Sequence, residues 1–192
     1  MKKVQISSIT PLKNPKFITP VRINYTQNTK EKSWEAVKSH NSVAILLYHQ
    51  EKDAFLLVKQ LRITTLLNND ETDGYTYELC AGIVDKDTSL KQIAKEEILE
   101  ECGYDVALEN IQRITSYYTS VGFSGAKQTM YYVKIDESMK KSEGGGIDDE
   151  EIELYFLPLS KAKTFMFDEN YKKTPGLMMA FYWFFNAKRS HG

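Results

Sequence analysis

The chain of 192 residues has few of the residues that stabilise a fold covalently or through a metal, with only two cysteines and three histidines. Cys80 and Cys102 fall in a strand-like and a helical segment, form no close pair and lack zinc spacing. Neither a disulfide framework nor a zinc site is therefore expected, and a reducing cytoplasm is the simplest setting. His40, His49 and His191 have no spacing that indicates a site.

Long apolar runs are also missing. Residues 176–185 form the most apolar stretch, which is too short to cross a bilayer and is expected to be a buried helix face. Lys2 and Lys3 are followed by no apolar core, so the amino terminus does not have the pattern of a signal peptide. No membrane partner is expected.

Neither sign of charge is in excess, since 25 Lys and Arg stand against 26 Asp and Glu, for a formal net charge of −1. A nearly neutral chain has no global attraction for nucleic acid, so no nucleic-acid partner is expected. Only a local positive patch could recruit an anionic substrate. The length of 192 residues suits one domain with a small appendage. Hydrophobic residues make up 42% of the chain, which is ordinary for a soluble globular protein.

The hydrophobic pattern predicts many short strands around one central helix. Residues 4–9 and 17–26 look extended, and residues 34–40 are expected to form a short helix or a turn. The remaining elements are predicted as a hairpin of strands 42–48 and 54–60, a polar loop 68–74, an extended segment 75–81, the central helix 90–102, strands 114–120, 128–135 and 152–157, and helices 160–165 and 175–188. The order is typical of an α+β fold.

The central helix has clear end signals. Ser89 followed three residues later by Gln92 fits a capping box, and Gly103 suits the position just past the end. At about 100° per residue, four residues form one apolar stripe along this helix: Leu90, Ile93, Ala94 and Ile98.

Three glutamates near the end of this helix point the wrong way for a solvated helix. Glu97 and Glu101 fall inside the apolar stripe, and Glu100 lies at its edge. Carboxylates that face a core are costly unless something pairs with them, and a group of like charges indicates a metal ion. A solvated acidic helix end is the alternative, but it would place the carboxylates on the opposite face. The pattern therefore favours an enzyme with a divalent cation.

A longer pattern around these glutamates resembles the signature of the Nudix hydrolases. It consists of Gly82, then five residues and Thr88, then seven residues and Glu96-Glu97-Ile98-Leu99-Glu100-Glu101-Cys102-Gly103-Tyr104. The chain keeps the glycines, the apolar positions and the three glutamates in register. It departs at Thr88, where the family has Glu, and at Glu96, where the family has an Arg that braces the metal-binding carboxylates.

The resemblance implies a Nudix α/β/α sandwich in which a mixed sheet carries the catalytic helix. It also implies a cofactor, Mg²⁺ with Mn²⁺ as a substitute, because hydrolysis of a pyrophosphate needs its charge shielded and its attacking water activated. The metal ligands would be Glu97, Glu101 and the carbonyl of Ala81, with Glu100 as a further ligand and catalytic group. Gly82 would let the loop turn its backbone toward the phosphates.

The flanking segments resemble the nucleotide-sugar branch of this family, namely Val58-Lys59-Gln60-Leu61-Arg62 and Tyr77-Glu78-Leu79-Cys80-Ala81-Gly82-Ile83-Val84-Asp85. Three more segments resemble UDP-sugar pyrophosphatases: Lys32-Ser33-Trp34, Val121-Gly122-Phe123-Ser124-Gly125 and Gln128-Thr129-Met130. The expected reaction is hydrolysis of UDP-glucose to UMP and glucose 1-phosphate. The alternative is ADP-ribose, giving AMP and ribose 5-phosphate, although ADP-ribose enzymes often have Pro at the position of Val121.

The same resemblance suggests residues for the substrate and the water. Arg62 would bind a phosphate, and Glu78 the base or ribose, with a plain strand-edge role as the alternative for both. Glu150 matches the loop glutamate that acts as catalytic base, in competition with its acidic neighbours Asp148, Asp149 and Glu151. A solvated charge run is the alternative for that loop. Three rings could stack on uracil or lie in the core: Tyr117, Tyr118 and Phe123.

The branch also implies two parts and a homodimer. Residues 1–40 would form a strand-rich extension that exchanges across the dimer, and residues 41–192 the Nudix domain, so Arg62 or the extension could serve the partner's site. Two other readings stay open. One is a different Nudix chemistry, on dinucleoside polyphosphates or an oxidised nucleotide. The other is a non-catalytic nucleotide-sugar sensor, although sensors tend to lose the acidic ligands that this chain keeps.

Overall fold

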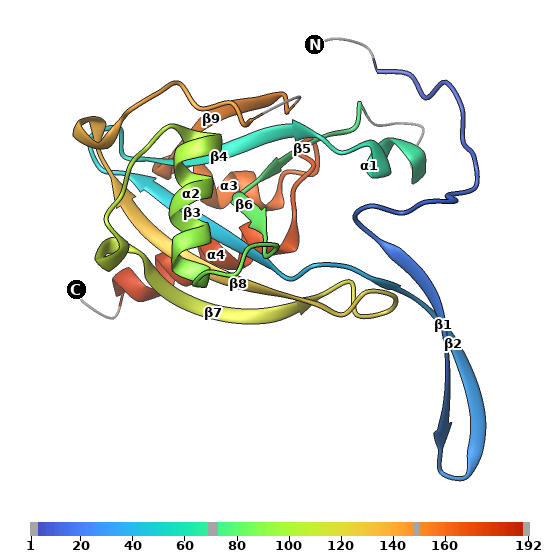
Figure 1. Ribbon diagram of the computed structural model, residues 1–192. Helices are drawn as coiled ribbons and strands as arrows, with labels where there is room; N and C mark the ends of the chain where they lie inside the picture. Colours follow the sequence, from blue (N-terminus) through green and yellow to red (C-terminus); the bar gives the residue numbers. More distant parts are fainter. Residues whose placement is uncertain (1–3, 69–72, 148–149, 190–192) are drawn as a thin grey trace.

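The computed structural model describes residues 4–68, 73–147 and 150–189. Nine strands, four α-helices and two short 3-10 helices fall in these ranges (Figure 1). The strands are β1 Thr19–Gln27, β2 Lys30–Lys38, β3 Ser42–His49, β4 Ala54–Leu61, β5 Tyr75–Glu78, β6 Cys80–Ile83, β7 Gln112–Thr119, β8 Ala126–Ile135 and β9 Ile152–Pro158. The helices are α1 Ile63–Asn68, α2 Leu90–Cys102, η1 Leu108–Asn110, η2 Glu137–Met139, α3 Leu159–Phe167 and α4 Pro175–Arg189.

One seven-stranded mixed sheet forms the body. Its main path runs β5-β4-β3-β8-β7, with β6 paired to β3 and β9 paired to β4. Strands β3 and β8 are parallel, and the other pairs are antiparallel. β3 therefore has two antiparallel partners on one side, β6 against its first half and β4 against its second half. This fork brings β6 against α2.

The sheet has helices on both faces (Figure 1). On one face, Ile93, Ala94 and Ile98 of α2 pack on a core that includes Val43, Ile45 and Val58 of the sheet. On the other face α3 and α4 cover a second core, rich in aromatic rings, that includes Phe55, Phe165, Phe181 and Phe184. The α+β class and the expected sandwich are confirmed, since a mixed sheet lies between two helical layers.

The chain before β3 forms a separate hairpin of β1 and β2 that stands away from the body (Figure 1). The expectation of a helix or turn over 34–40 is wrong, because Trp34 pairs with Ile23 across this hairpin. Asn28 and Thr29 both have positive φ, 51° and 66°, as in the two-residue turns that match the twist of a hairpin. The extended segment predicted over residues 4–9 forms no strand among the described residues.

The other predicted elements agree with the structure within a few residues. The predicted polar loop 68–74 overlaps residues 69–72, which lie outside the described ranges, and α1 just before it was not predicted. The predicted segment 75–81 divides into β5 and β6, which pair with different strands. No helix among the described residues has the length and apolar character needed to span a bilayer.

Candidate active site

The acidic residues of the candidate site stand on α2, both ends of which are capped. The Ser89 hydroxyl accepts a hydrogen bond from the Gln92 N–H at 3.1 Å, and Gly103 adopts φ 80° just past the last turn. In a full capping box the Gln92 side chain would bond back to the Ser89 backbone. Here it donates from Nε2 to Glu96 at 2.9 Å. The predicted ends of the helix are confirmed. Of the two hydrogen bonds of a capping box, the structure has the one from the Gln92 N–H to Ser89 and not the one back from the Gln92 side chain.

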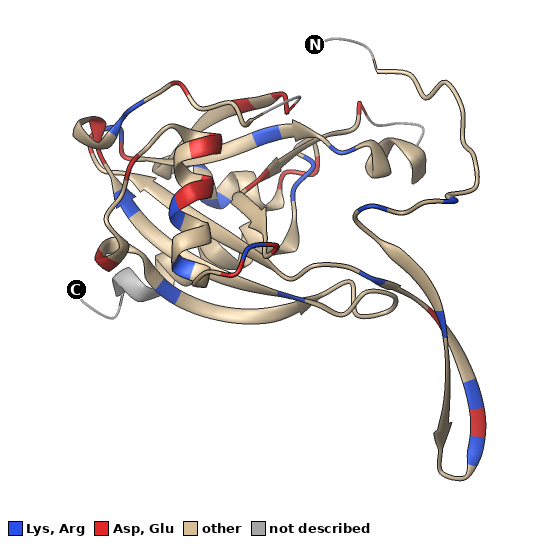
Figure 2. Cartoon of the chain, in the orientation of Figure 1, with Lys and Arg blue, Asp and Glu red and all other residues tan. Residues whose placement is uncertain are grey.

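The acidic residues of α2 lie in its C-terminal half (Figure 2). Glu101 is 5% exposed, whereas Glu97 and Glu100 are half-buried, so these carboxylates do not stand on a solvated face. Leu90 was expected in the buried stripe, and that expectation is wrong because Leu90 is 36% exposed. It adjoins the exposed residues 85–89 rather than a strand of the sheet.

Glu101 reaches from α2 to the backbone of β6. Its Oε2 accepts the N–H of Ala81 at 3.0 Å, and the thiol of Cys80 also donates to the carboxylate. Burial raises the pKa of Glu101 to about 8, the two donors oppose this rise, and the nearby charges of Glu97 and Glu150 add to it. The site therefore holds a carboxylate whose ionised form needs a cation close by.

Glu97 occupies the space over Gly82. A Cβ built on Gly82 would lie 1.8 Å from Glu97 Oε1, so any side chain at residue 82 would displace the carboxylate. Burial raises the pKa of Glu97 to about 7, with further contributions from the charges of Glu100 and Glu150 and an opposing one from Lys86. Glycine is needed here for close approach, not for an unusual φ.

A glycine loop wraps the C-terminal end of α2. The N–H groups of Gly145 and Gly146 donate to the carbonyls of Glu101 and Glu100 at 2.8 and 3.2 Å, so the loop satisfies carbonyls that a helix end leaves free. All three glycines have positive φ, 67°, 109° and 88° for Gly144, Gly145 and Gly146. The loop that follows is thereby tied to the glutamate-bearing end of α2.

Glu150 belongs to this loop. Its Oε2 accepts the N–H of Ile147 at 3.2 Å, so the side chain folds back on its own loop. Its loop is held at the glutamate-bearing end of α2 by Gly145 and Gly146, and its charge contributes to raising the pKa of both Glu97 and Glu101. Its predicted competitors Asp148 and Asp149 lie outside the described residues.

Arg62 and Glu78, the two predicted substrate-binding residues, bind each other. Arg62 donates from Nε and Nη2 to the two carboxylate oxygens of Glu78, each at 2.7 Å, and the Thr76 hydroxyl donates to Glu78 at 2.5 Å. Glu78 is 8% exposed, whereas the Arg62 side chain is 45% exposed. The pKa of Arg62 is raised, chiefly by its hydrogen bond to Glu78, and the charges of Glu101 and Glu150 raise it further. Glu78 therefore fixes one edge of the guanidinium, and the opposite edge stays open to an anion.

The three rings considered for stacking on a base have different surroundings. Tyr117 packs against the core under α4, and its hydroxyl donates to Gln128. Tyr118 and Phe123 are 66% and 57% exposed. A pocket of about 410 Å³ between the end of β7 and the start of α4 reaches Glu78 and Ala81 and has both tyrosines in its wall. Tyr117 is thus a core residue that also borders a pocket beside the candidate site.

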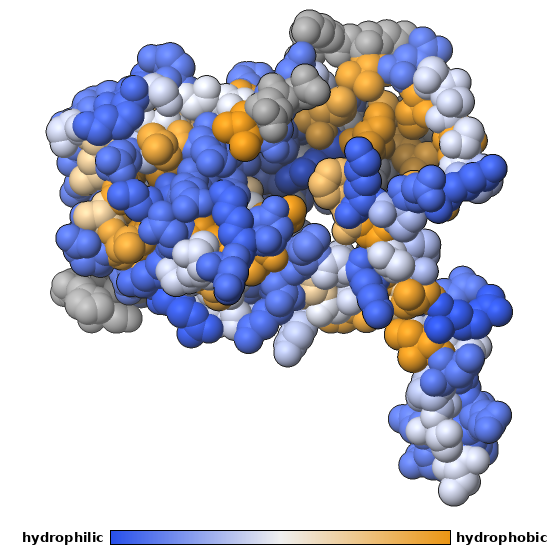
Figure 3. Space-filling view, viewed as in Figure 1, coloured by the Kyte–Doolittle hydropathy of each residue, from blue (hydrophilic) through white to orange (hydrophobic). Residues whose placement is uncertain are grey.

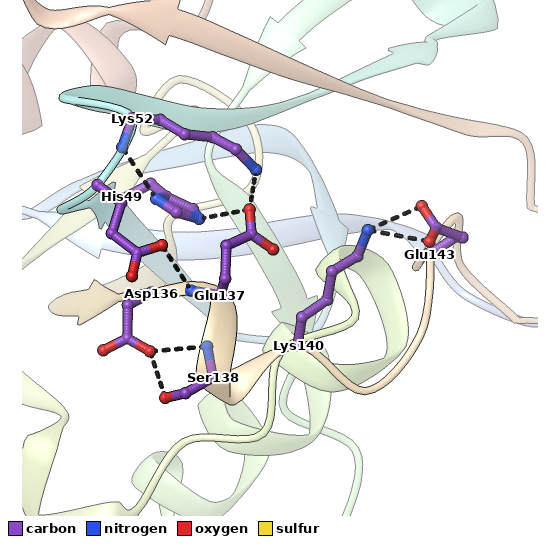
Figure 4. Close-up of polar contacts among 8 residues, drawn as sticks. His49, Lys52, Asp136, Glu137, Ser138, Lys140 and Glu143 are labelled. Atoms are coloured by element: carbon purple, nitrogen blue, oxygen red, sulfur yellow. Dashed lines mark hydrogen bonds and ion pairs between the residues drawn. The ribbon is translucent and has the colours of Figure 1, made fainter.

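A second acidic group lies elsewhere, where His49, Glu51 and Glu137 bring ligand atoms within 4.8 Å of one another (Figure 4). The Nδ1 of His49 accepts the N–H of Lys52 at 3.3 Å, so the neutral ring carries its proton on Nε2, which faces Glu137 at 3.3 Å. The ammonium of Lys52 also pairs with Glu137. These contacts make an ion-pair cluster that does not fit a metal.

This cluster is also separate from the strand β6 backbone that meets Glu101, since the His49 ring instead contacts Tyr104, just past the end of α2, with ring centroids 5.9 Å apart. His49 is five residues along β3 from Ala44, which pairs with Ala81, and five residues of strand span about 16 Å. His49 was expected to have no role, but the structure gives it a buried place in the polar cluster.

The residues on α2 fit a divalent cation better. Glu97 and Glu101 are oxygen donors of the kind that Mg²⁺ prefers, and both have pKa values raised by burial and by other carboxylates. Carboxylates at i and i+4 share a helix face. A cation held between them would offset the burial and the repulsion between carboxylates that raise these pKa values.

Three contacts at the site were missed from the sequence. The Cys80 and Cys102 side chains meet in the core, against the expectation that they are apart, and both are free. Burial raises the pKa of the Cys80 thiol well above its usual value. Thr76 lies two residues before Glu78, a spacing that puts both on one face of a strand and could have indicated their bond. Lys86 bonds to Glu96, and no local pattern indicates that pair.

Comparison with known proteins agrees with this geometry. The model of the NUDIX domain matches residues 38–176. The chain is 35% identical to the bovine (Bos taurus) uridine diphosphate glucose pyrophosphatase NUDT14 over 89% of each chain, and 32% identical to the mouse (Mus musculus) protein of that name over 91% of each. It is 34% identical to a GDP-mannose pyrophosphatase of Pectobacterium atrosepticum over 72% of this chain and 70% of that protein. This chain belongs to the NUDIX domain family.

Proposed function

We propose that this protein hydrolyses the pyrophosphate bond of a nucleoside diphosphate sugar, with UDP-glucose as the preferred substrate. Water attacks one phosphorus, the P–O bond of the anhydride breaks, and the products are UMP and glucose 1-phosphate. The observation that carries the proposal is the convergence of Glu97 and Glu101 on the backbone of residues 81 and 82. The relatives named for UDP-glucose pyrophosphatase support the substrate.

Glu97, Glu101 and the carbonyl of Ala81 would hold Mg²⁺, with Glu100 as a further ligand. In an extended strand the N–H and C=O of one residue point to the same side, and the Ala81 N–H points at Glu101. The Ala81 carbonyl is thereby directed toward the same carboxylate, which supports its role. When bound, Mg²⁺ shields the pyrophosphate oxygens and lowers the pKa of the attacking water. Mn²⁺ can replace it.

Arg62 binds a phosphate of the substrate through the guanidinium edge that Glu78 leaves open. Arg62 is the better candidate for direct contact because its side chain is partly exposed, whereas Glu78 is nearly buried beneath it. Glu78 then acts by orienting Arg62, and it meets the base or ribose through the pocket that it borders. The backbone of Gly82 lines the same loop.

Glu150 accepts the proton of the attacking water. Its loop is tied to α2 through Gly145 and Gly146, while the Glu150 side chain is exposed and bonded only within the loop by the contacts described above. Rotation of this side chain toward Glu97 and Glu101 on substrate binding would bring a base to the two carboxylates that would hold the metal. Glu151 is the competitor that the described residues contain.

A product-release screen tests the proposal. UDP-glucose, GDP-mannose, ADP-ribose and a dinucleoside polyphosphate are each incubated with the full chain and Mg²⁺ or Mn²⁺. Nucleoside monophosphate and sugar phosphate are then quantified. Fastest release of UMP from UDP-glucose is expected. Faster release of AMP from ADP-ribose would favour the alternative substrate. Tight calorimetric binding of UDP-glucose without any release would favour a sensor.

We also propose a homodimer formed through the extension, residues 1–40, with the Nudix domain over residues 41–192. Apolar side chains stand exposed on the hairpin and at its root (Figure 3), among them Ile18, Ile23 and Trp34 at 45%, 47% and 56%. Exposed apolar side chains on a projecting hairpin suit a protein partner. Light scattering after size exclusion should give twice the chain mass, and Ile23→Glu should give the monomer. A cytoplasmic location is our further proposal, supported by two free, buried thiols.

A further inference from the structure

The loop between β6 and α2 has few buried side chains. Residues 85–89 are all exposed, and the loop is fixed at its ends, where Val84 N–H donates to the Asn41 carbonyl at 2.8 Å and Ser89 caps the helix. Between these ends Thr88 N–H donates to the Lys86 carbonyl at 3.0 Å, a contact within the loop itself. The position of the loop over α2 therefore depends on few contacts.

One side-chain bridge links the middle of this loop to the helix. Lys86 Nζ donates to Glu96 Oε2 at 2.7 Å, and Gln92 Nε2 donates to Glu96 Oε1 at 2.9 Å. Both oxygens of Glu96 are thus occupied, one by the loop and one by the preceding turn of α2. Gln92 holds the Glu96 carboxylate in place, and Glu96 holds Lys86.

This bridge spans the same two segments as the close contact of the candidate site. Lys86 lies four residues after Gly82, and Glu96 directly precedes Glu97, whose carboxylate fills the space over Gly82. A shift of the loop away from α2 would move the Gly82 backbone away from Glu97. The Lys86–Glu96 bridge holds the loop against α2 four residues after Gly82, and the contact of Gly82 with Glu97 lies between the same two segments.

We propose that Lys86 and Glu96 form a positioning clamp that holds the Gly82 loop against α2 for the pyrophosphatase reaction. The inference rests on the proposed function for its kinetic consequences. At the position of Glu96 the family motif has an arginine. In this chain the helix therefore supplies the negative charge of the pair, and Lys86 of the loop supplies the positive charge. Neither residue is assigned to the substrate.

The clamp should matter for rate more than for global stability. The Lys86 side chain is 53% exposed, and an exposed ion pair contributes little to folding. Misplacement of a catalytic group by a fraction of an ångström to one ångström can nevertheless lower the rate by about ten- to a hundredfold. Lys86→Gln and Glu96→Gln should therefore each lower kcat about tenfold, with little change in KM and melting temperature.

The decisive variants are a double mutant and a charge swap. Lys86→Gln/Glu96→Gln should be no slower than the slower single variant, because one bridge is lost only once. Lys86→Glu/Glu96→Lys should recover most of the wild-type kcat, because the bridge is rebuilt with its charges reversed. Lys86→Arg should also keep most of the rate. The matched control is Lys95→Gln, which breaks another ion pair of α2, between Lys95 and Asp105 just past the end of the helix, at 3.0 Å.

Hydrogen exchange gives a readout independent of catalysis. Amides of residues 83–88 should exchange faster in each single variant than in the wild type, and at the wild-type rate in the charge swap. Equal exchange in all variants, single losses that multiply in the double variant, or a charge swap as slow as the singles would each overturn the clamp. If the wild type releases no product from any nucleotide sugar, the proposed function fails, and exchange still decides the clamp.

Discussion

The carboxylate of Glu97 lies so close to Gly82 that a methyl group on residue 82 would sit 1.8 Å from Glu97 Oε1. Gly82→Ala should therefore displace Glu97 and lower kcat by at least about a hundredfold. Steady-state rates at saturating Mg²⁺ measure the effect. Gly122→Ala is the matched control, because nothing lies within 4 Å of its added Cβ and its φ is not positive. Comparable rates for the two variants would contradict the contact.

Glu101→Gln should abolish turnover while the fold remains intact. The amide keeps the shape of the side chain and removes the charge that we propose to hold the metal, so a loss of at least about a thousandfold in kcat is expected. Circular dichroism and calorimetric titration with Mn²⁺ check the fold and the metal site. The control is Glu109→Gln, which makes the same substitution at an exposed glutamate of η1. Near-normal activity of Glu101→Gln with Mg²⁺ would remove the assignment.

Stability without metal should fall as the pH rises. The folded-state pKa values of Glu97 and Glu101 are about 7 and about 8, above the ordinary glutamate value of 4.5. Between these limits the folded chain binds more protons than the unfolded chain, so the stability from these groups is complete below about pH 4.5 and is lost through pH 7 to 8. Melting in EDTA from pH 5 to 8.5 should show the decline.

Two controls belong to that experiment. Glu101→Gln should have a shallower decline, since one of the two titrating groups is removed. Excess Mg²⁺ should stabilise the wild type more at pH 8 than at pH 6, because metal binding needs ionised carboxylates. A wild-type melting temperature that rises steadily to pH 8.5 in EDTA would be inconsistent with the burial of these two groups.

Arg62→Ala should affect stability and substrate binding by separate routes. It leaves the buried Glu78 carboxylate with Thr76 as its remaining described donor, which should cost about 1–3 kcal/mol in the free energy of unfolding. It also removes the proposed phosphate contact, so KM should rise. Arg62→Ala/Glu78→Gln should recover stability in urea unfolding but not KM. Recovery of both would assign Arg62 a purely structural role.

Glu150→Gln should lower kcat about a hundredfold with a small change in KM, since it removes a base and no proposed substrate contact. Glu151→Gln is the paired variant from the next residue of the same loop. The ratio of the two rates at saturating UDP-glucose measures which residue serves the water. A larger loss for Glu151→Gln would transfer the role of base to Glu151.

Elements with local signals were predictable from the sequence. The ends of α2 follow from Ser89 and Gly103, and the inward direction of Glu97 and Glu101 follows from helical spacing. Strands β3 and β4 were found because each contains a continuous apolar run and a short polar turn separates them. These signals involve residues within a few positions of each other, so tertiary context had little to change.

Elements without a local signal were missed. Strand β2 owes its conformation to pairing with β1, and residues 34–38 taken alone have no alternation that distinguishes a strand from a helix. The division of residues 75–81 into β5 and β6 depends on two separate partners, β4 and β3. Pairing partners lie far along the chain, where periodicity gives no information.

By itself the sequence determined the family motif, the spacing of the glutamates and the helix that carries them, because helix geometry is local. Only the tertiary structure decided that Arg62 is held by Glu78, that the Glu101 carboxylate meets the Ala81 amide, and that Lys86 is bridged to Glu96. Such contacts join segments ten or more residues apart in the chain, which only folding brings together. Their geometry depends on packing, which no short stretch of sequence encodes.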